Sequence, residues 1–223
     1  MTTATKTRTV DLAKLKVEER TELINAVNVL DVLRKYFLVY GFDVTVDLYK
    51  SMGSFFLDCI SGKSYLDFFT YVASHPLGMN HPALDNDEFI SEIGKIAVNK
   101  PSLSDIYTEV QAKFVSEFFR IAVPPYFKYS FFIEGGALAV ENALKTAFDW
   151  KVRKNFEKGY KEEKGHQVIH FKEAFHGRSG YTLSLTNTDP TKILYFPKFN
   201  WPRIDNPKVT YPLNEENLAA VMK

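Results

Sequence analysis

The stretch from Tyr129 to Trp150, YSFFIEGGALAVENALKTAFDW, constrains the fold most, because it predicts a strand, a glycine turn and a helix in direct succession. Its first part, Tyr129 to Ile133, is short, aromatic and β-branched, which is typical of a buried strand in a parallel sheet. Gly135 and Gly136 then turn the chain. The pattern therefore predicts a chain of the α/β class.

A helix is predicted from Ala137 onward, because apolar residues recur at helical spacing along one face. These residues are Val140, Leu144, Ala147 and Phe148. Glu141 and Lys145 lie on the other face, four residues apart, and we expect them to form an ion pair.

The start of this helix is a candidate anion site. A helix that begins with Gly-Gly-Ala presents unpaired backbone N–H groups at the positive end of its dipole, where a phosphate can approach closely. The signal is weak by itself, because a glycine pair between strand and helix is also simply a tight turn. It matches neither the G-x-G-x-x-G fingerprint of dinucleotide folds nor the P-loop. The rest of the chain has to decide between these alternatives.

Composition narrows the class of protein. The 223 residues are 45% hydrophobic and 15% aromatic, which is typical of a globular protein with a sizeable core. A net charge of +1 argues against nucleic acid or a membrane surface as the main partner. The single cysteine, Cys59, excludes an internal disulfide framework and fits a reducing compartment. Because no long apolar segment and no secretory signal are visible, we expect a cytoplasmic protein.

The first part of the chain predicts a helix followed by a small antiparallel unit. An amphipathic helix is expected from Glu18 to Tyr40 and a half-buried strand from Asp43 to Tyr49. The runs Ser54 to Ile60 and Ser64 to Phe69 flank a turn at residues 61–63 and predict a hairpin. A loop rich in turn residues follows from Thr70 to Pro82.

Two more helices are predicted after this loop, one from Asp87 to Val98 and one through Arg120 that Ser104 caps. The second helix should turn its apolar stripe inward; the stripe consists of Val110, Phe114, Phe118 and Ile121. His75 and His81 in the preceding loop match no zinc spacing, so we interpret them as surface or capping histidines and predict no metal site.

The last part of the chain contains a second strand candidate and a cluster of chemically useful residues. Charged residues from Lys151 to Lys164 predict a solvated helix end and a connection, and Val168 to Phe171 predicts a buried strand. Aromatic, imidazole and guanidinium groups then follow within Ala174–Gly180. Open α/β sheets place ligands at the carboxyl ends of their strands, so this segment is a second candidate site. Asn214 is expected to cap a final helix.

With the glycine turn and the Phe175–Arg178 segment in view, the sequence resembles the class III pyridoxal-phosphate-dependent aminotransferases. GSFFLDCISGKSYLDFFTYVASHPLGMNHPAL matches their amino-terminal pattern of Gly, Asp, Gly and Tyr-Leu-Asp before a Leu-Gly-x-Asn-His-Pro turn. Within that family, EGGALAVENALKTAFDWK, AFHGRSGYTLSLTNTDPTK and FPKFNWPRID look like the lysine 6-aminotransferase branch. The resemblance runs from about Leu30 to the last residue.

The resemblance implies the fold type I architecture of these transferases. Residues 1–80 would be the amino-terminal helix and antiparallel hairpin segment of the small domain. Residues 81–223 would be the first, incomplete part of the large cofactor-binding domain, whose sheet is mostly parallel. The family also implies a homodimer for the full-length protein.

The resemblance assigns roles to individual residues. Gly136 and Ala137 would donate backbone N–H groups to the cofactor phosphate, although most class III enzymes have Ser or Thr in place of Ala137 and so make one more contact. Phe175 would stack on the pyridine ring, with His176 in support beside the cofactor. Arg178 would bind the substrate carboxylate. The alternatives are that Phe175 is a plain core residue and Arg178 a structural ion-pair partner.

No catalytic residue is expected within this chain. The family's Schiff-base lysine and the acidic partner of the pyridine nitrogen lie in the half of the sequence that follows Lys223. The lysines present, including Lys145 and Lys172, match no such position. The chain alone is therefore expected to be inactive.

The implied reaction transfers the ε-amino group of L-lysine to 2-oxoglutarate through pyridoxal 5'-phosphate, giving 2-aminoadipate 6-semialdehyde and glutamate. One alternative is another ω-aminotransferase that acts on ornithine or 4-aminobutyrate. A second is a non-catalytic fragment or paralogue that survives as a dimerising or binding module. A third is a phosphate-binding α/β domain unrelated to pyridoxal.

Overall fold

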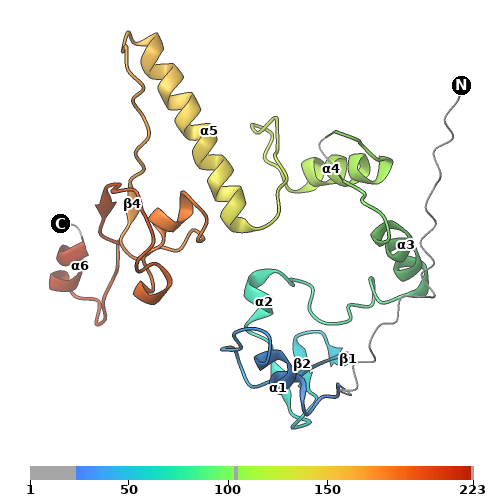
Figure 1. Cartoon of the computed structure of the whole chain (residues 1–223). Coiled ribbons are helices and arrows are strands. Elements are labelled where there is room, and N and C mark those ends of the chain that lie inside the picture. Colours follow the sequence, from blue (N-terminus) through green and yellow to red (C-terminus); the bar gives the residue numbers. More distant parts are fainter. Residues whose placement is uncertain (1–23, 103–104, 222–223) are drawn as a thin grey trace, which may run out of the picture. The chain divides into compact units, whose positions relative to one another are not determined.

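A computed structural model describes residues 24–102 and 105–221, which Figure 1 shows in colour. The chain forms two compact units that divide between Ile121 and Ala122. The division into these two units does not test the domain boundary that is expected at residue 80, so that boundary stays a prediction. None of the helices in the described ranges is long and apolar enough to cross a membrane.

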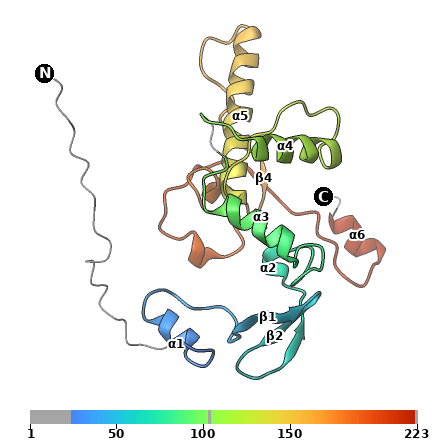
Figure 2. The same cartoon turned by 90° about the vertical axis from the view of Figure 1, so that its right-hand side faces the viewer.

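The first unit contains the predicted antiparallel hairpin. Its sheet has the order β1 (Val46–Met52), β2 (Phe55–Asp58) and β3 (Ser64–Leu66), with neighbouring strands antiparallel (Figure 2). The side chains of Phe56 and Tyr65 are directly opposite and stack with ring centroids 5.4 Å apart. The hairpin prediction is confirmed, although β1 begins three residues later than expected.

The carboxylate of Asp58 holds the hairpin turn. It accepts hydrogen bonds from the N–H groups of Thr45 at 3.0 Å, Ile60 at 3.2 Å and Ser61 at 3.0 Å. It also accepts one from the Ser61 hydroxyl at 2.5 Å. Asp58 is only 3% exposed. These hydrogen bonds, that of the Ser61 hydroxyl foremost, hold the pKa of Asp58 far below its ordinary value of 3.8.

A strained turn follows the hairpin. Residues Thr70 to Ala73 form the short element α2, in which every φ angle lies between 46° and 60°, in the left-handed region. Side chains with a Cβ atom rarely adopt this conformation, and Val72 is branched at Cβ as well. The chain there is a left-handed turn within the predicted loop.

The rest of the loop is anchored on the hairpin. The side-chain amide of Asn80 donates to the carbonyl oxygens of Leu48 and Ser51, both at 2.7 Å. Gly53 and Met79 exchange backbone hydrogen bonds of 2.8 Å and 2.9 Å. The loop is therefore held by backbone groups of the sheet.

The first predicted helix is much shorter than expected. Only α1 (Val29–Arg34) is helical between residues 24 and 40, and residues 18–23 lie outside the described part. The side-chain oxygen of Asn25 accepts from the N–H groups of Val27 and Asn28, which turns the chain before the helix. No residue of α1 is buried, so no tertiary packing extends it.

The next helix is confirmed and the following one is partly corrected. Element α3 (Asp87–Ala97) begins where expected, with the Asn86 side chain accepting from Phe89 N–H at 3.0 Å. Element α4 (Glu109–Ile121) begins later than predicted. The expected cap, Ser104, lies outside the described residues, whereas the Thr108 hydroxyl accepts from Gln111 N–H at 3.2 Å.

The prediction that the apolar stripe of α4 faces inward is wrong. Its apolar side chains are 36% to 71% exposed; they are Val110, Phe114, Phe118 and Ile121. A helical stripe becomes buried only where another element packs on it, and spacing alone does not say whether such an element is present.

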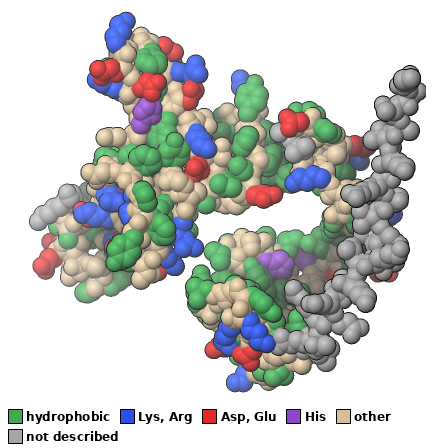
Figure 3. Space-filling view, viewed as in Figure 1, with side chains coloured by type: hydrophobic (Ala, Val, Ile, Leu, Met, Phe, Trp, Pro, Cys, Tyr) green, Lys and Arg blue, Asp and Glu red, His purple; other side chains and the backbone are tan. Residues whose placement is uncertain are grey.

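In the second unit the helix after the glycine turn is confirmed. Element α5 runs from Gly136 to Glu157 and ends in a charged, solvated stretch, visible as blue and red side chains at the top of Figure 3. The chain then returns along α5, where the Asn155 side chain donates to the carbonyl oxygen of Lys164 at 2.6 Å (Figure 1).

The prediction of a strand from Tyr129 to Ile133 is wrong. These residues form no strand, and their large side chains are 39% to 89% exposed. A strand requires a neighbour with free N–H and C=O groups, and none of the described segments pairs with this one. The second strand is confirmed only in part: β4 (His170–Phe171) pairs in parallel with β5 (Arg203–Ile204), while Val168 and Ile169 remain outside it.

The core of the second unit is a polar segment packed beside aromatic rings. The 3-10 helix η2 (Thr182–Leu185) and the following Thr186 are buried, with three hydroxyl-bearing residues at 0% exposure. Close by, Phe148 of α5 contacts Tyr181 and Trp201 with ring centroids 5.6 Å and 5.7 Å apart. Phe199 stacks on Trp201 at 4.9 Å. This aromatic cluster joins α5 to the segments on either side of η3 (Pro190–Lys192).

The final helix, α6 (Glu215–Val221), starts where predicted, because the side-chain oxygen of Asn214 accepts from the N–H group of Asn217 at 2.8 Å. The cap prediction is confirmed.

We expect Asp58→Asn to destabilise the hairpin, because an amide offers one acceptor oxygen where the carboxylate uses two. In the full-length protein the Tm at pH 7 should fall by about 2–5 °C. The pKa of Asp58 in the folded protein lies below 3.8, so the wild-type advantage is complete above that pH and declines as the pH falls below it. Thermal melts between about pH 7 and pH 3 measure this, with exposed Asp43→Asn as control. Equal Tm values at pH 7 would contradict the role of Asp58.

Candidate functional site

Two predicted site segments, the start of α5 and Ala174–Gly180, are in contact within the second unit. A Cβ atom placed on Gly177 would lie 2.4 Å from the Cβ of Ala137, closer than real side chains pack. Gly177 also has a φ of 106°, which side chains rarely tolerate. Both the space and the backbone therefore require glycine here, and its absence of a side chain brings the two segments together.

The start of α5 is open to a ligand. Gly135 precedes the helix with φ 81° and ψ 148°, and no side chain caps the helix. The N–H groups of Gly136, Ala137 and Leu138 precede the first helical hydrogen bond, which Ala139 N–H makes to the carbonyl of Gly135. Nothing lies within 4 Å of the position of a Cβ on Gly136. An anion can therefore approach these N–H groups directly.

Buried hydroxyls hold the loop that carries the second segment. The Thr186 hydroxyl accepts from the N–H group of His176 at 3.0 Å and donates to the carbonyl oxygen of Gly177 at 2.6 Å. The N–H group of Asn187 donates to the carbonyl of Ala174 at 2.8 Å. These bonds fix the backbone on both sides of Phe175 without a strand ladder. Sequence reasoning missed Thr186, because its partners His176 and Gly177 lie 10 and 9 residues earlier in the chain.

Glu141 makes a further connection that the sequence did not predict. Its carboxylate accepts a short hydrogen bond from the Ser179 hydroxyl and another from the N–H group of Tyr181 at 3.2 Å. No ion pair forms between Glu141 and Lys145 in the described structure, so that expectation is wrong. Glu141 accepts from two half-buried donors of the loop, and these hydrogen bonds outweigh a weak exposed ion pair.

The side chains available for binding are exposed. Phe175 is 56% exposed, and Arg178 and His176 are exposed as well. Among the described residues the Arg178 guanidinium has no hydrogen-bond or ion-pair partner. The structure therefore does not support the alternatives of Phe175 as core and Arg178 as an internal ion-pair partner.

The arrangement combines three binding functions in one place. The start of α5 can bind an anion, the Phe175 ring can stack on a flat ring, and the Arg178 guanidinium can bind a second anion in a bidentate manner. Lys172, close to this segment in the sequence, forms an exposed ion pair with Asp205 at 2.8 Å. The described residues also contain no group of three His, Cys, Asp or Glu side chains that could hold a metal ion.

The other histidines have structural contacts. His170 is buried and its Nε2 atom accepts from the Arg203 guanidinium at 3.2 Å. His166 packs edge-on against Phe148, with centroids 5.9 Å apart. In the first unit His81 Nδ1 accepts from Ala83 N–H at 3.2 Å and so stabilises a turn of the loop.

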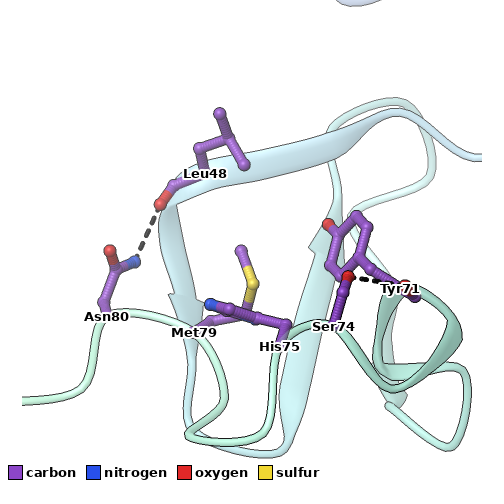
Figure 4. Close-up of a pocket in the computed structure, with 6 residues that line it drawn as sticks. All are labelled: Leu48, Tyr71, Ser74, His75, Met79 and Asn80. Atoms are coloured by element: carbon purple, nitrogen blue, oxygen red, sulfur yellow. Dashed lines mark hydrogen bonds between the residues drawn. The ribbon is translucent and has the colours of Figure 1, made fainter. Parts of the chain in front are cut away.

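The first unit has a hollow of about 450 Å³ between the hairpin and the loop after α2 (Figure 4). It is lined by Leu48, Tyr71, Ser74, His75, Met79 and Asn80. The Nδ1 atom of His75 is buried there without a hydrogen-bond partner among the described residues. Because the lining has one imidazole and no charged group, it does not define a chemistry.

Comparison with known proteins identifies the family. The profile described as Aminotransferase class-III matches residues 41–222. The L-lysine-epsilon aminotransferase of Mycobacterium tuberculosis is 54% identical over 192 residues, which are 86% of this chain and 43% of that protein. The 4-aminobutyrate aminotransferase of Schizosaccharomyces pombe is 30% identical over 200 residues, which are 82% of this chain and 42% of that protein.

Solved structures agree with the sequence relatives. The structure described as lysine aminotransferase from M. tuberculosis in the internal aldimine form matches with a TM-score of 0.82 at 53% identity. The match covers 89% of this chain and 46% of that one. This likeness confirms the predicted α/β fold class, a part of fold type I. The chain spans less than half the length of the relatives that it matches, and it belongs to the class III aminotransferases.

Proposed function

We propose that the full-length protein is an L-lysine 6-aminotransferase that transfers the ε-amino group of lysine to 2-oxoglutarate. The products would be 2-aminoadipate 6-semialdehyde and glutamate. The observation that carries this proposal is the contact of Gly177 with Ala137, which combines an anion-binding helix start with an exposed ring and an unpaired guanidinium. The higher identity to a lysine enzyme than to a 4-aminobutyrate enzyme supports lysine as the amino donor.

The proposed cofactor is pyridoxal 5'-phosphate, and the residues present fit it. Gly136 and Ala137 would bind its phosphate through backbone N–H groups, since no side chain occupies the space beside Gly136. Phe175 would stack on its ring and so set the plane of the ring, with His176 in support. When bound, the cofactor supplies an electron sink for the carbon that loses a proton.

The substrate would be held by Arg178. A guanidinium with no partner among the residues that the structure describes can bind the α-carboxylate of lysine with two parallel hydrogen bonds. This contact leaves the ε-amino group, at the other end of the substrate, for the reaction. An arginine at this point therefore favours a substrate with a carboxylate remote from the reacting amine.

The lysine that binds the cofactor covalently is proposed to lie outside residues 1–223, because none of the lysines of this chain matches its family position. The proposal extends to a cytoplasmic homodimer with no nucleic-acid or membrane partner. It also places residues 1–80 in the small domain and residues 81–223 in the large one.

A substrate panel tests the proposed function. The full-length protein is incubated with pyridoxal phosphate, 2-oxoglutarate and one of lysine, ornithine or 4-aminobutyrate, and glutamate is measured. We expect lysine to have the highest kcat/KM. Preference for ornithine or 4-aminobutyrate would favour the other ω-aminotransferases. Bound cofactor without turnover of any amine would favour a non-catalytic paralogue, and no cofactor absorbance would favour a phosphate-binding domain unrelated to pyridoxal.

The phosphate site predicts different effects for two neighbouring substitutions. Gly136→Val should weaken cofactor binding at least about tenfold, because its side chain fits the protein but occupies the path of the anion. Ala137→Ser should leave binding within about threefold, since the backbone contacts remain. Cofactor titration of both full-length variants measures this, and far-UV circular dichroism checks their folding. Equal affinities would remove Gly136 from the site.

The carboxylate site predicts a substrate-selective loss. Arg178→Ala should lower kcat/KM for lysine by roughly a hundredfold or more, because a charge-assisted bidentate contact contributes about 1.5–3 kcal/mol or more when desolvated. Cofactor affinity should barely change. Arg153→Ala removes an exposed ion pair with Asp149 and serves as control. Unaltered kinetics with lysine in Arg178→Ala would mean that another cation binds the carboxylate.

A further inference from the structure

We propose that Glu141 is a positioning residue that holds Arg178 at a set place relative to the start of α5, and so couples carboxylate recognition to the cofactor site. The inference rests on the proposed function for the role of Arg178. It rests on the hydrogen bonds of the described chain for the role of Glu141.

Glu141 closes a hydrogen-bond network in which every donor has one acceptor. The Ser179 N–H group donates to the Thr182 hydroxyl at 2.9 Å. The hydroxyls of Ser179 and Thr182 lie 2.7 Å apart. Because the Ser179 hydroxyl donates to Glu141, the Thr182 hydroxyl is the donor of that pair. The carboxylate is thus the final acceptor of the chain of hydrogen bonds, and it also accepts from Tyr181 N–H.

The network connects α5 to the loop just after Arg178, and Gly177 connects the two just before it. Gly177 lies against Ala137 in the first turn of α5, with no room for a side chain between them. Ser179 and Tyr181 are bonded to Glu141 one turn further along the same helix. The backbone of Arg178 is therefore attached to α5 on both sides, while its side chain remains free to bind.

This double attachment matters because the reaction requires the cofactor phosphate and the substrate carboxylate to be held at a fixed distance from each other. The start of α5 binds the phosphate, and Arg178 binds the carboxylate at the far end of the substrate. A shift of the loop by about 1 Å would move the carboxylate site against the reacting amine, and misplacement of that size can cost about a hundredfold in rate. Thr182 at 0% exposure gives the loop a rigid base on its other side.

Removing the acceptor should therefore weaken lysine recognition more than cofactor binding. We expect Glu141→Ala to lower kcat/KM for lysine by about 10- to 100-fold, mostly through KM, with cofactor affinity within about threefold. Glu141→Gln keeps an acceptor oxygen of the same reach and should recover most of the loss. Asp149→Asn, on the same helix but exposed and paired with Arg153, is the matched control and should have no effect.

A substrate without the carboxylate isolates the step through Arg178. For 1,5-diaminopentane, which is lysine without its carboxylate, Glu141→Ala should change kcat/KM less than about threefold. In the double variant with Arg178→Ala, the loss for lysine should not exceed that of Arg178→Ala alone, since two residues that act as a unit are not additive. Equal losses for both amines, or losses that multiply in the double variant, would overturn the proposal.

Hydrogen exchange tests the attachment independently of activity. In the full-length protein, a peptide covering residues 177–183 should exchange about tenfold faster in Glu141→Ala than in wild type, while Asp149→Asn stays unchanged. Unchanged exchange in Glu141→Ala would overturn the proposal even if lysine turnover falls. If the wild-type protein does not convert lysine, the proposed function fails and the role toward the carboxylate fails with it. In that case, faster exchange in Glu141→Ala would support only the attachment of the loop to α5.

Discussion

The contact between Gly177 and Ala137 is the constraint on which the candidate site depends. The first lies in a loop after β4 and the second in the first turn of α5, and only the absence of a side chain on Gly177 lets them touch. A methyl group there would force the loop away from the helix, because its carbon would lie 2.4 Å from the Cβ of Ala137. Displacements on the order of 1 Å are enough to disturb productive substrate geometry. The candidate ligand groups Phe175 and Arg178 lie on this loop, so their positions follow from that contact.

Hydroxyl groups take the place of a strand ladder around this loop. Thr182, Ser184 and Thr186 are each fully buried, yet each bonds a backbone group of a neighbouring segment. Ser184, for example, accepts from the N–H group of Phe199 at 2.9 Å, next to the aromatic cluster. Burying a hydroxyl without a partner would cost free energy, whereas here the same groups satisfy loop N–H and C=O groups that no strand reaches. A polar core of this kind specifies one loop conformation.

Sequence reasoning was accurate where structure is encoded locally. The helix after the glycine turn, the Asn214 cap and the hairpin turn at Asp58 all depend on residues a few positions apart, and all were predicted or lie within predicted elements. It failed where burial depends on a distant partner. The run Tyr129–Ile133 has strand composition, but composition does not supply a neighbouring strand.

The same distinction between local patterns and distant contacts explains which residues of the candidate site could be predicted. Gly136, Phe175 and Arg178 could be singled out from residue type and motif, since glycine, aromatic and guanidinium groups have recognisable chemistry. Thr186 and Glu141 could not, because a threonine in a polar run and a glutamate on a helix face are usually solvated. Their roles come from contacts across 9 and 38 residues of sequence, which no local pattern contains.

In the loop that carries Arg178 the backbone is held in place, whereas the side chains that could bind a ligand are exposed. Gly177 is buried, while its neighbours His176 and Arg178 are exposed. A binding loop gains affinity when its backbone is ordered before the ligand arrives, because the ligand then does not have to supply that ordering free energy. In the role proposed for it, the side chain of Arg178 must nevertheless remain unpaired, since an internal ion pair would have to be broken before a carboxylate could bind. Attaching the loop through Thr186 on one side of Arg178 and Glu141 on the other satisfies both requirements, because neither attachment uses the guanidinium.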